Sequence, residues 1–239
     1  SAEAIDLCND KAAMATALEG LPVPQPRTLR PASLEEFVAG CRELGYPRVA
    51  VCFKPPVAKG SRGFRILSAD VDRVGQLLHE RPLSRAMTLE EFVDIFRDVE
   101  PFPRLLLMEY LDGPEFTVDA LVAGGELVLH QAKTRERIET GVAMAFRTVD
   151  RPALVDTTRR VCRALRLDWF VNVQFIGDHL LEVNPRVSTF VYQEDFILPY
   201  LGVKYALGEL DPAAGAAAQA RVRTSRRTIR YYDQVFWDA

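Results

Sequence analysis

The most informative stretch of this chain is residues 170–188, which read FVNVQFIGDHLLEVNPRVS. Two apolar runs typical of β-strands flank a Gly-Asp pair at 177–178, which is typical of hairpin turns. Three polar residues interrupt the buried pattern of these runs: Gln174, Glu182 and Asn184. A buried carboxylate costs several kcal/mol unless it is paired or bound to a cation. The stretch therefore predicts a hairpin with a functional polar face.

The three polar side chains predict a magnesium site. Glu182 and Asn184 are two residues apart and so share one face of a strand. Carboxylate and carboxamide oxygens suit Mg²⁺, a hard cation that proteins usually bind together with substrate phosphates. Pro185 ends the strand, and Arg186 follows within reach of the same site. The alternative is a plain ion pair between Glu182 and Arg186, but the order Gln-x7-Glu-x-Asn-Pro-Arg favours the metal site.

The length of the hairpin turn tests this interpretation. A strict two-residue loop at 177–178 pairs residue 174 with residue 181, which places Gln174 and Glu182 on opposite faces. A loop of odd length, or a β-bulge, places them on the same face. Because a shared metal ion requires the same face, we predict the loop of odd length.

Length and composition describe a globular protein without a basic surface. The 239 residues suffice for one large domain or two small ones. A formal net charge of −3 gives no electrostatic support for a nucleic-acid partner. The four cysteines are scattered without a CxxC pair, which favours reduced thiols and a cytoplasmic location over a zinc site. The sequence shows no apolar run of transmembrane length and no signal-peptide pattern, so we expect no membrane partner.

The order of expected elements is an α+β pattern, with strand–helix–strand units first and antiparallel hairpins later. We expect helices that begin after Asn9, Ser33, Asp70 and Thr88, and a further helix over 152–165. Strands are expected over 49–54, 64–67 and 105–111. Hairpins are expected over 115–132 and 170–184. Residues 211–220 are predicted to form a linker or a surface loop, and residues 227–237 a last strand.

Features far apart in the sequence fit one site for a nucleotide triphosphate. Lys54 ends a buried strand and faces a glycine loop, residues 59–63, whose N–H groups can cap phosphate oxygens. Backbone groups at 109–111 can recognise an adenine ring, and Glu115 can accept hydrogen bonds from ribose hydroxyls. The plain alternatives are an ordinary turn, a strand end and a solvated carboxylate. The loop lacks the pattern G-x-x-x-x-G-K-[ST], which excludes the commonest kind of NTPase.

With these residues in hand, the chain resembles the ATP-grasp superfamily from residue 9 to about residue 209. The likeness is greatest to the ATP-binding domains of carbamoyl phosphate synthetase large subunits and related carboxylate–amine ligases. NVQF and EVNPRVS are its most specific parts, with glutamine rather than glutamate at the first metal position. The resemblance implies two α+β subdomains that clasp ATP. Residues 1–45 would be leading helices, 46–112 the small subdomain with the glycine loop, and 113–239 the large subdomain with the metal site.

The resemblance also implies cofactors and residue roles. ATP and two Mg²⁺ ions are the expected cofactors, with Mn²⁺ as a substitute. Gln174 and Glu182 would ligate the metal and Asn184 would complete the set, while Arg186 and Lys54 would act on the transferring phosphoryl group. The nucleotide-binding set that it implies is Lys11, Lys54, Lys59, Gly60, Ser61, Gly63, Met108, Glu109, Tyr110, Leu111 and Glu115.

The activity that the resemblance implies is ligation. ATP would phosphorylate a small-molecule carboxylate, and an amine or ammonia would attack the acyl phosphate. Two alternatives stay open: an ATP-binding subunit or regulatory module without turnover of its own, and a kinase or ATPase. Relatives usually carry an N-terminal α/β domain before the position of Asn9, so we expect an incomplete catalytic unit that needs such a domain or a partner subunit, with a homodimer as a further option.

The segment Lys133–Arg137 is more basic than the resemblance implies. Lys133, Arg135 and Arg137 would bind a phosphate or an anionic substrate, or would form a solvated charge run.

Overall fold

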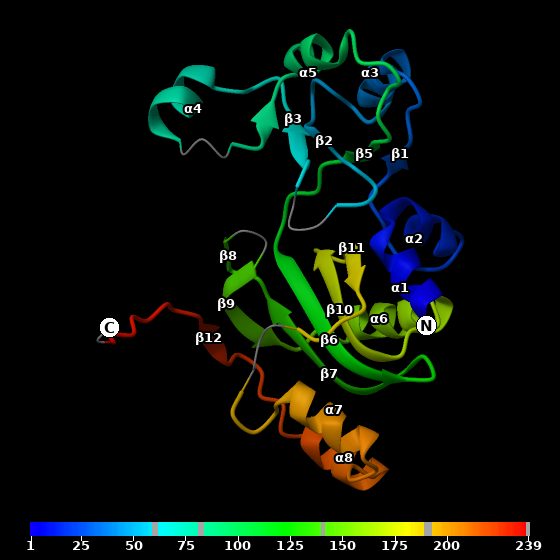
Figure 1. Ribbon diagram of the computed structural model, residues 1–239, viewed down its shortest axis with the longest axis vertical. Helices are drawn as coiled ribbons and strands as arrows, with labels where there is room; N and C mark the ends of the chain where they lie inside the picture. Colours follow the sequence, from blue (N-terminus) through cyan, green and yellow to red (C-terminus); the bar gives the residue numbers. More distant parts are fainter. Residues whose placement is uncertain (59–61, 81–83, 140–141, 189–192, 238–239) are drawn as a thin grey trace. The chain divides into compact units, whose positions relative to one another are not determined.

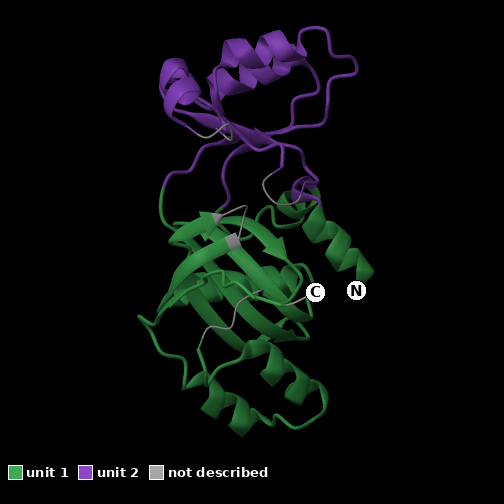
Figure 2. Cartoon of the chain, turned by 60° about the vertical axis from the view of Figure 1, so that its left-hand side comes forward, with its two compact units in different colours: residues 1–9, 13–24, 113–239 green, residues 10–12, 25–112 purple. Residues whose placement is uncertain are grey.

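The computed structural model describes residues 1–58, 62–80, 84–139, 142–188 and 193–237 (Figure 1). The chain forms two compact units, one of residues 1–9, 13–24 and 113–239 and the other of residues 10–12 and 25–112 (Figure 2). The α+β fold class is confirmed. Residues 1–45, expected as one leading segment, are shared between the two units.

The second unit, residues 10–12 and 25–112, is built on a small sheet with strand order β1-β5-β2-β3-β4. Its strands pair antiparallel except for β3 and β4, which are parallel. Its described elements are β1 (Thr28–Leu29), α3 (Leu34–Glu43), β2 (Val51–Lys54), β3 (Arg65–Leu67), α4 (Arg73–His79), β4 (Ala86–Met87), α5 (Leu89–Phe96) and β5 (Leu106–Glu109). Phe37 and Phe92 stack in its core with ring centroids 4.0 Å apart.

Helix capping agrees with the sequence in part. Thr88 begins α5, as predicted, and it does so with a complete capping box, in which the Thr88 side chain and the Glu91 side chain each accept a backbone N–H of the other residue. Ser33 caps α3, but the Glu36 carboxylate accepts the N–H of Ala32 instead of closing the box. Asp72, not Asp70, caps α4.

The prediction that Asn9 begins the first helix is wrong. Asn9 ends α1 (Ala2–Asn9), and α2 (Lys11–Ala17) follows. The Asp10 carboxylate accepts the N–H of Ala12 at 2.9 Å, so the neighbour of Asn9 caps the second helix.

The first unit, residues 1–9, 13–24 and 113–239, holds the larger sheet, with strand order β11-β10-β6-β7-β9-β12 and β8 paired to β9 (Figure 1). All of these pairs are antiparallel. Beyond α1 its described elements are β6 (Glu115–Ala123), β7 (Glu126–Thr134), β8 (Arg137–Glu139), β9 (Val142–Val149), α6 (Pro152–Ala164), β10 (Trp169–Ile176), β11 (His179–Asn184), α7 (Leu198–Ala206), α8 (Pro212–Gln219) and β12 (Arg227–Ile229).

The prediction of a linker or loop at residues 211–220 is wrong, because α8 occupies most of it. Asp211 caps this helix, Pro212 stands in its first turn, and alanines fill its interior. Each of these favours a helix. The last strand, β12, is shorter than the predicted 227–237.

The two faces of the larger sheet have different coverings. Along β6, Phe116, Val118 and Ala120 enter an apolar core that includes residues of α1 and α6. The alternate residues of β6 face the other way, where Leu121 joins an apolar cluster beneath α7 and α8. Beside this cluster, the second face carries the predicted metal ligands.

The hairpin β10–β11 has an even loop, so the predicted loop of odd length is wrong. Ile176 pairs with His179 across the two-residue turn, and Gly177 has φ 55°. The register then shifts by one residue, and Gln174 pairs directly with Glu182. A β-bulge thus places both side chains on the same face, as the shared site requires.

All four cysteines are free and buried. Burial raises the pKa of Cys8 to about 11 and the pKa of Cys41, Cys52 and Cys162 to about 12. Because the thiolate is the reactive form, we expect the native protein to react very slowly with a thiol reagent at pH 8 and many-fold faster in denaturant. Absorbance of the released chromophore measures both rates. A native thiol that reacts at the denatured rate would contradict this assignment.

Among the described residues, no helix combines the length and the apolar character needed to cross a membrane.

Candidate functional site

Polar side chains form two rows across four strands of the larger sheet, on the face opposite α6. The first row aligns Gln131, Asp119, Asn172 and Asn184, and the second aligns Lys133, Thr117, Gln174 and Glu182. Residues paired across neighbouring strands share a face, so all eight project to the same side of the sheet. The metal ligands predicted from sequence are therefore one end of a wider polar surface.

A buried ion pair lies within these rows. Lys133 Nζ is 3.0 Å from Asp119 Oδ2, and the two side chains are 3% and 1% exposed. Burial lowers the pKa of Lys133, and the Asp119 carboxylate opposes that shift. The Lys133 ammonium also lies 5.2 Å from the centre of the Phe146 ring. The interpretation of Lys133–Arg137 as a solvated charge run is therefore wrong at Lys133.

Asn172 connects this ion pair to the predicted metal ligands. Its Nδ2 donates to Asp119 Oδ1 at 2.6 Å. Its Oδ1 accepts from Gln174 Nε2 at 3.1 Å and from Asn184 Nδ2 at 3.3 Å. Asn184 Nδ2 also donates to Glu182 Oε1 at 2.9 Å. One hydrogen-bonded network thus joins all three predicted ligands.

Arg135 borders the network on its other side. Its Nη1 donates to Gln174 Oε1 and lies 3.0 Å from Glu115 Oε2. The Arg135 side chain is only 9% exposed, so it is not part of a solvated run either. Glu115 and Gln174, predicted to contact ribose and metal, are thus brought together by a single guanidinium.

The donor set fits Mg²⁺. Glu182 supplies a carboxylate, and Gln174 and Asn184 supply carboxamide oxygens, all hard ligands. Among the described residues, no group of three or more His, Cys, Asp or Glu could hold a metal ion. A set with a single carboxylate balances only half of the charge of the Mg²⁺ ion. Such a site suits a cation that arrives with phosphate groups, as Mg²⁺ commonly does.

Two paired strands of the second unit carry predicted nucleotide residues. Lys54 is the last residue of β2, and Met108 and Glu109 lie on β5, opposite the start of β2. Lys11 lies close to the segment after β2: its N–H donates to the carbonyl of Pro56 at 3.1 Å and its Nζ to that of Ala58 at 3.2 Å.

The remaining predicted residues lie in loops. Tyr110 and Leu111 follow β5 directly. Gly63 has φ 71°, and a Cβ there would lie 2.6 Å from Pro55 Cδ, so the position requires glycine. Lys59, Gly60 and Ser61 fall outside the described residues. Arg186 is exposed, and its Nη1 donates to the carbonyl of Val187 at 3.2 Å.

Comparison with known proteins decides the family. Residues 101–228 match a family model described as ATP-grasp in the biosynthetic pathway with Ter operon. The chain belongs to the ATP-grasp family. Carbamoyl phosphate synthase large chains are among its relatives: that of Archaeoglobus fulgidus is 30% identical over 207 residues, and that of Lachnoclostridium phytofermentans 28% over 205. Each match covers 80% of this chain and 17% of the relative.

Solved structures show the same ATP-grasp fold. Phosphoribosylglycinamide synthetase from Anaerococcus prevotii aligns with a TM-score of 0.62 at 17% identity, over 94% of this chain and 55% of that chain. A biotin carboxylase–β,γ-ATP complex from Campylobacter jejuni aligns with a TM-score of 0.59 at 17% identity, over 94% of this chain and 49% of that chain.

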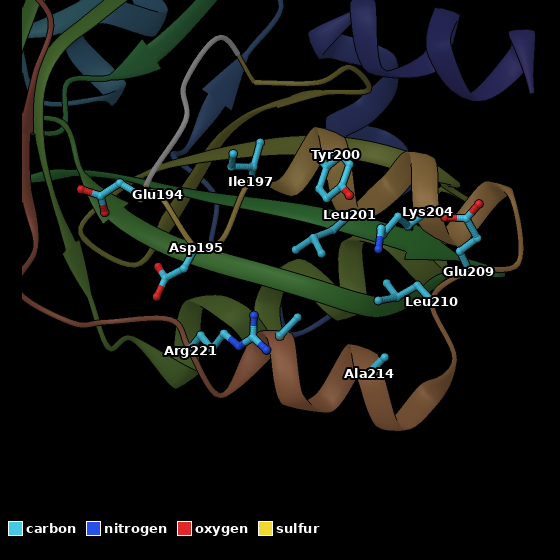
Figure 3. A pocket seen from close by; sticks show the side chains of 11 residues that line it. Glu194, Asp195, Ile197, Tyr200, Leu201, Lys204, Glu209, Leu210, Ala214 and Arg221 are labelled. Atoms are coloured by element: carbon cyan, nitrogen blue, oxygen red, sulfur yellow. The ribbon is translucent and has the colours of Figure 1, made fainter.

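The structure also has a cavity that the sequence did not predict. A cavity of about 360 Å³ lies against α7 and α8 in the first unit, with Tyr200, Lys204 and Arg221 on its wall (Figure 3). Glu194 and Asp195 also line it, and both pair with Arg223. None of the predicted site residues lines this cavity.

The sequence missed Asp119 and Asn172 as site residues. Both lie in strands where polar and apolar residues alternate. A strand with one face in solvent gives the same alternation, so the pattern alone did not mark them as site residues. One signal was present: Asn172 stands two residues before Gln174 and so shares its strand face.

Proposed function

We propose that this chain is the nucleotide-binding core of an ATP-dependent ligase that joins a carboxylate to an amine or to ammonia. The observation that carries the proposal is the joined set of Gln174, Glu182 and Asn184 on one sheet face. Membership of the ATP-grasp family supports the same chemistry. The chain spans 17% of the length of the carbamoyl phosphate synthases it matches, so the activity of a longer protein is part of the proposal.

The proposed reaction has two steps. A carboxylate oxygen attacks the γ-phosphorus of ATP, the bond to the bridging oxygen breaks, and ADP leaves. The amine nitrogen then attacks the acyl carbon, the bond to the phosphate oxygen breaks, and the nitrogen loses a proton. Neither step needs a covalent protein nucleophile, because phosphoryl transfer depends mainly on positioning and charge stabilisation. The four buried cysteines are consistent with that requirement.

The described residues supply positioning and charge. Gln174, Glu182 and Asn184 would hold Mg²⁺, which when bound neutralises negative charge on the phosphates. Glu115, held by Arg135 at 3.0 Å, offers a carboxylate for ribose hydroxyls. Arg186 is exposed and would interact with the transferring phosphoryl group. Lys11 and Lys54 would neutralise phosphate charge. The glycine loop, residues 59–63, would cover the phosphates, although its residues 59–61 lie outside the described part of the chain.

The first test is nucleotide binding. We expect calorimetric titration to show ATP binding that strengthens at least tenfold when Mg²⁺ is present, because one carboxylate and two amides bind the metal well only with phosphate oxygens. Mn²⁺ should substitute for Mg²⁺. A folded sample, verified by circular dichroism, that binds ATP in neither condition would refute the proposal.

A second candidate function is an ATP-binding module without turnover of its own. ADP release separates the two candidates when carboxylates and amines are added singly and in pairs. Release that requires both substrates supports the ligase. Binding without stimulated release supports the module, and release that needs only one acceptor indicates a kinase.

A further inference from the structure

A carboxamide can ligate a metal through only one of its two ends. Its oxygen binds a cation, whereas its NH₂ group is a donor and repels one. The two ends have nearly the same shape, so packing alone selects poorly between them. Gln174 and Asn184 therefore need some partner that fixes their orientation if they are to serve Mg²⁺, whereas the Glu182 carboxylate presents oxygen from either side.

The Lys133–Asp119 pair provides a fixed starting point. An ammonium can only donate, and an ionised carboxylate can only accept. Asp119 Oδ2 lies 3.0 Å from Lys133 Nζ, and Asp119 Oδ1 accepts from Asn172 Nδ2 at 2.6 Å. The carboxylate thereby allows Asn172 one orientation, with Nδ2 toward Asp119 and Oδ1 directed away.

Asn172 passes this polarity to the predicted ligands. Its Oδ1 accepts from Gln174 Nε2 and Asn184 Nδ2 at 3.1 and 3.3 Å. Both carboxamides thus direct their NH₂ groups toward Asn172, and their oxygens point away from it. A second contact reinforces each choice: Gln174 Oε1 accepts from Arg135, and Asn184 Nδ2 donates to Glu182.

We propose that Asp119 and Asn172, anchored by Lys133, are positioning residues that direct the carboxamide oxygens of Gln174 and Asn184 toward the metal. This inference rests on the proposed function. It explains why a charged pair that is almost fully buried lies in the same two rows as the ligands. Burial of such a pair stabilises a protein weakly by itself, but it can specify one arrangement of its neighbours.

Gln131 offers a matched control. It stands in the same row as Asn172, on the other side of Asp119, and both side chains are nearly fully buried. Among the described residues its side-chain nitrogen and oxygen have no hydrogen-bond partner. Replacing it by leucine removes a buried carboxamide from the same sheet face without touching the network.

The decisive variant is Asn172→Leu, compared with Gln131→Leu and the wild type. Mn²⁺ binding is followed by electron paramagnetic resonance in the presence of a non-hydrolysable ATP analogue, and binding of the analogue alone by calorimetry. We expect Asn172→Leu to weaken metal binding by about 10- to 100-fold, the usual effect of losing a group that orients a ligand. Binding of the analogue without metal should stay within about twofold, and Gln131→Leu should match the wild type in both.

A second readout requires no metal. In ¹⁵N-labelled wild type, the side-chain NH₂ groups of Gln174 and Asn184 should exchange slowly with solvent, and they should exchange faster in Asn172→Leu. If Asn172→Leu does not fold, Asp119→Asn is measured in the same way. This variant keeps the shape of the side chain, but it can present either an oxygen or an NH₂ group to Asn172, so it no longer fixes the orientation of Asn172. Metal binding within about twofold of wild type in a folded variant would overturn the positioning role.

The two proposals fail in different ways. A wild-type chain that binds no Mn²⁺ with the nucleotide analogue overturns the proposed function, and with it the purpose of the arrangement. A wild type that binds metal, beside an Asn172→Leu variant that binds it equally well, overturns only the positioning role.

Discussion

Replacing Glu182 by glutamine is expected to remove the magnesium-dependent part of ATP binding and to lower phosphoryl transfer by about 10²–10³-fold. The change deletes the one carboxylate of the predicted ligand set and keeps its shape. Glu182 is only half-buried and accepts a hydrogen bond from Asn184, which a glutamine oxygen can still accept. The unfolding midpoint should therefore stay close to that of the wild type. Calorimetry with and without Mg²⁺ and the rate of ADP release measure the two effects.

Glu126→Gln is the matched control for this variant. It makes the same change of charge on the same sheet, at the far end of the β6–β7 hairpin, where Glu126 pairs with Arg163 in solvent. Exposed pairs of this kind contribute little to stability, so neither binding nor folding should change. ATP turnover by Glu182→Gln equal to that of the wild type would show that Glu182 is not a metal ligand.

The predicted ligands were visible in the sequence because they break a local pattern. Gln174, Glu182 and Asn184 stand in short apolar strands, where a polar side chain needs a reason. The bulge that brings Gln174 opposite Glu182 left no such sign, since the extra residue in β11, Leu181, is an ordinary strand residue. The functional requirement of a shared face was met, but it led to the wrong loop length, because the Gly-Asp turn at 177–178 is an ordinary two-residue turn and a bulge makes the correction.

Long-range partners were the main omission. Asp119 and Lys133 are 14 residues apart on two strands, and only the register of the β6–β7 hairpin brings them together. A sequence pattern describes which residues share a face of one strand, but not how two strands align beyond a turn. The partners of Arg135 were missed for the same reason, because Glu115 and Gln174 lie on β6 and β10.

The predictions of helix boundaries were wrong where composition was given more weight than capping residues. Residues 211–220 are rich in alanine and contain proline and glycine, which suggested a loop. The Asp211-Pro212 pair is a helix start, and α8 begins there. At the first helix, two adjacent capping residues competed, and local sequence gave no basis for choosing Asp10 over Asn9.

Lys133→Met is expected to lower the free energy of unfolding by about 3–5 kcal/mol, because it leaves the buried Asp119 carboxylate without its cation. Urea denaturation measures the loss. The double variant Lys133→Met with Asp119→Leu removes both charges, and we expect it to be more stable than the single variant. It should not fully regain wild-type stability, because Asn172 Nδ2 loses its acceptor at a cost of about 1–3 kcal/mol. Arg163→Met, which breaks the exposed pair with Glu126, is the control and should change little. A Lys133→Met variant as stable as the wild type would mean that Asp119 is neutral or is paired elsewhere. The fixed donor–acceptor order that orients Asn172 would then lack its anchor.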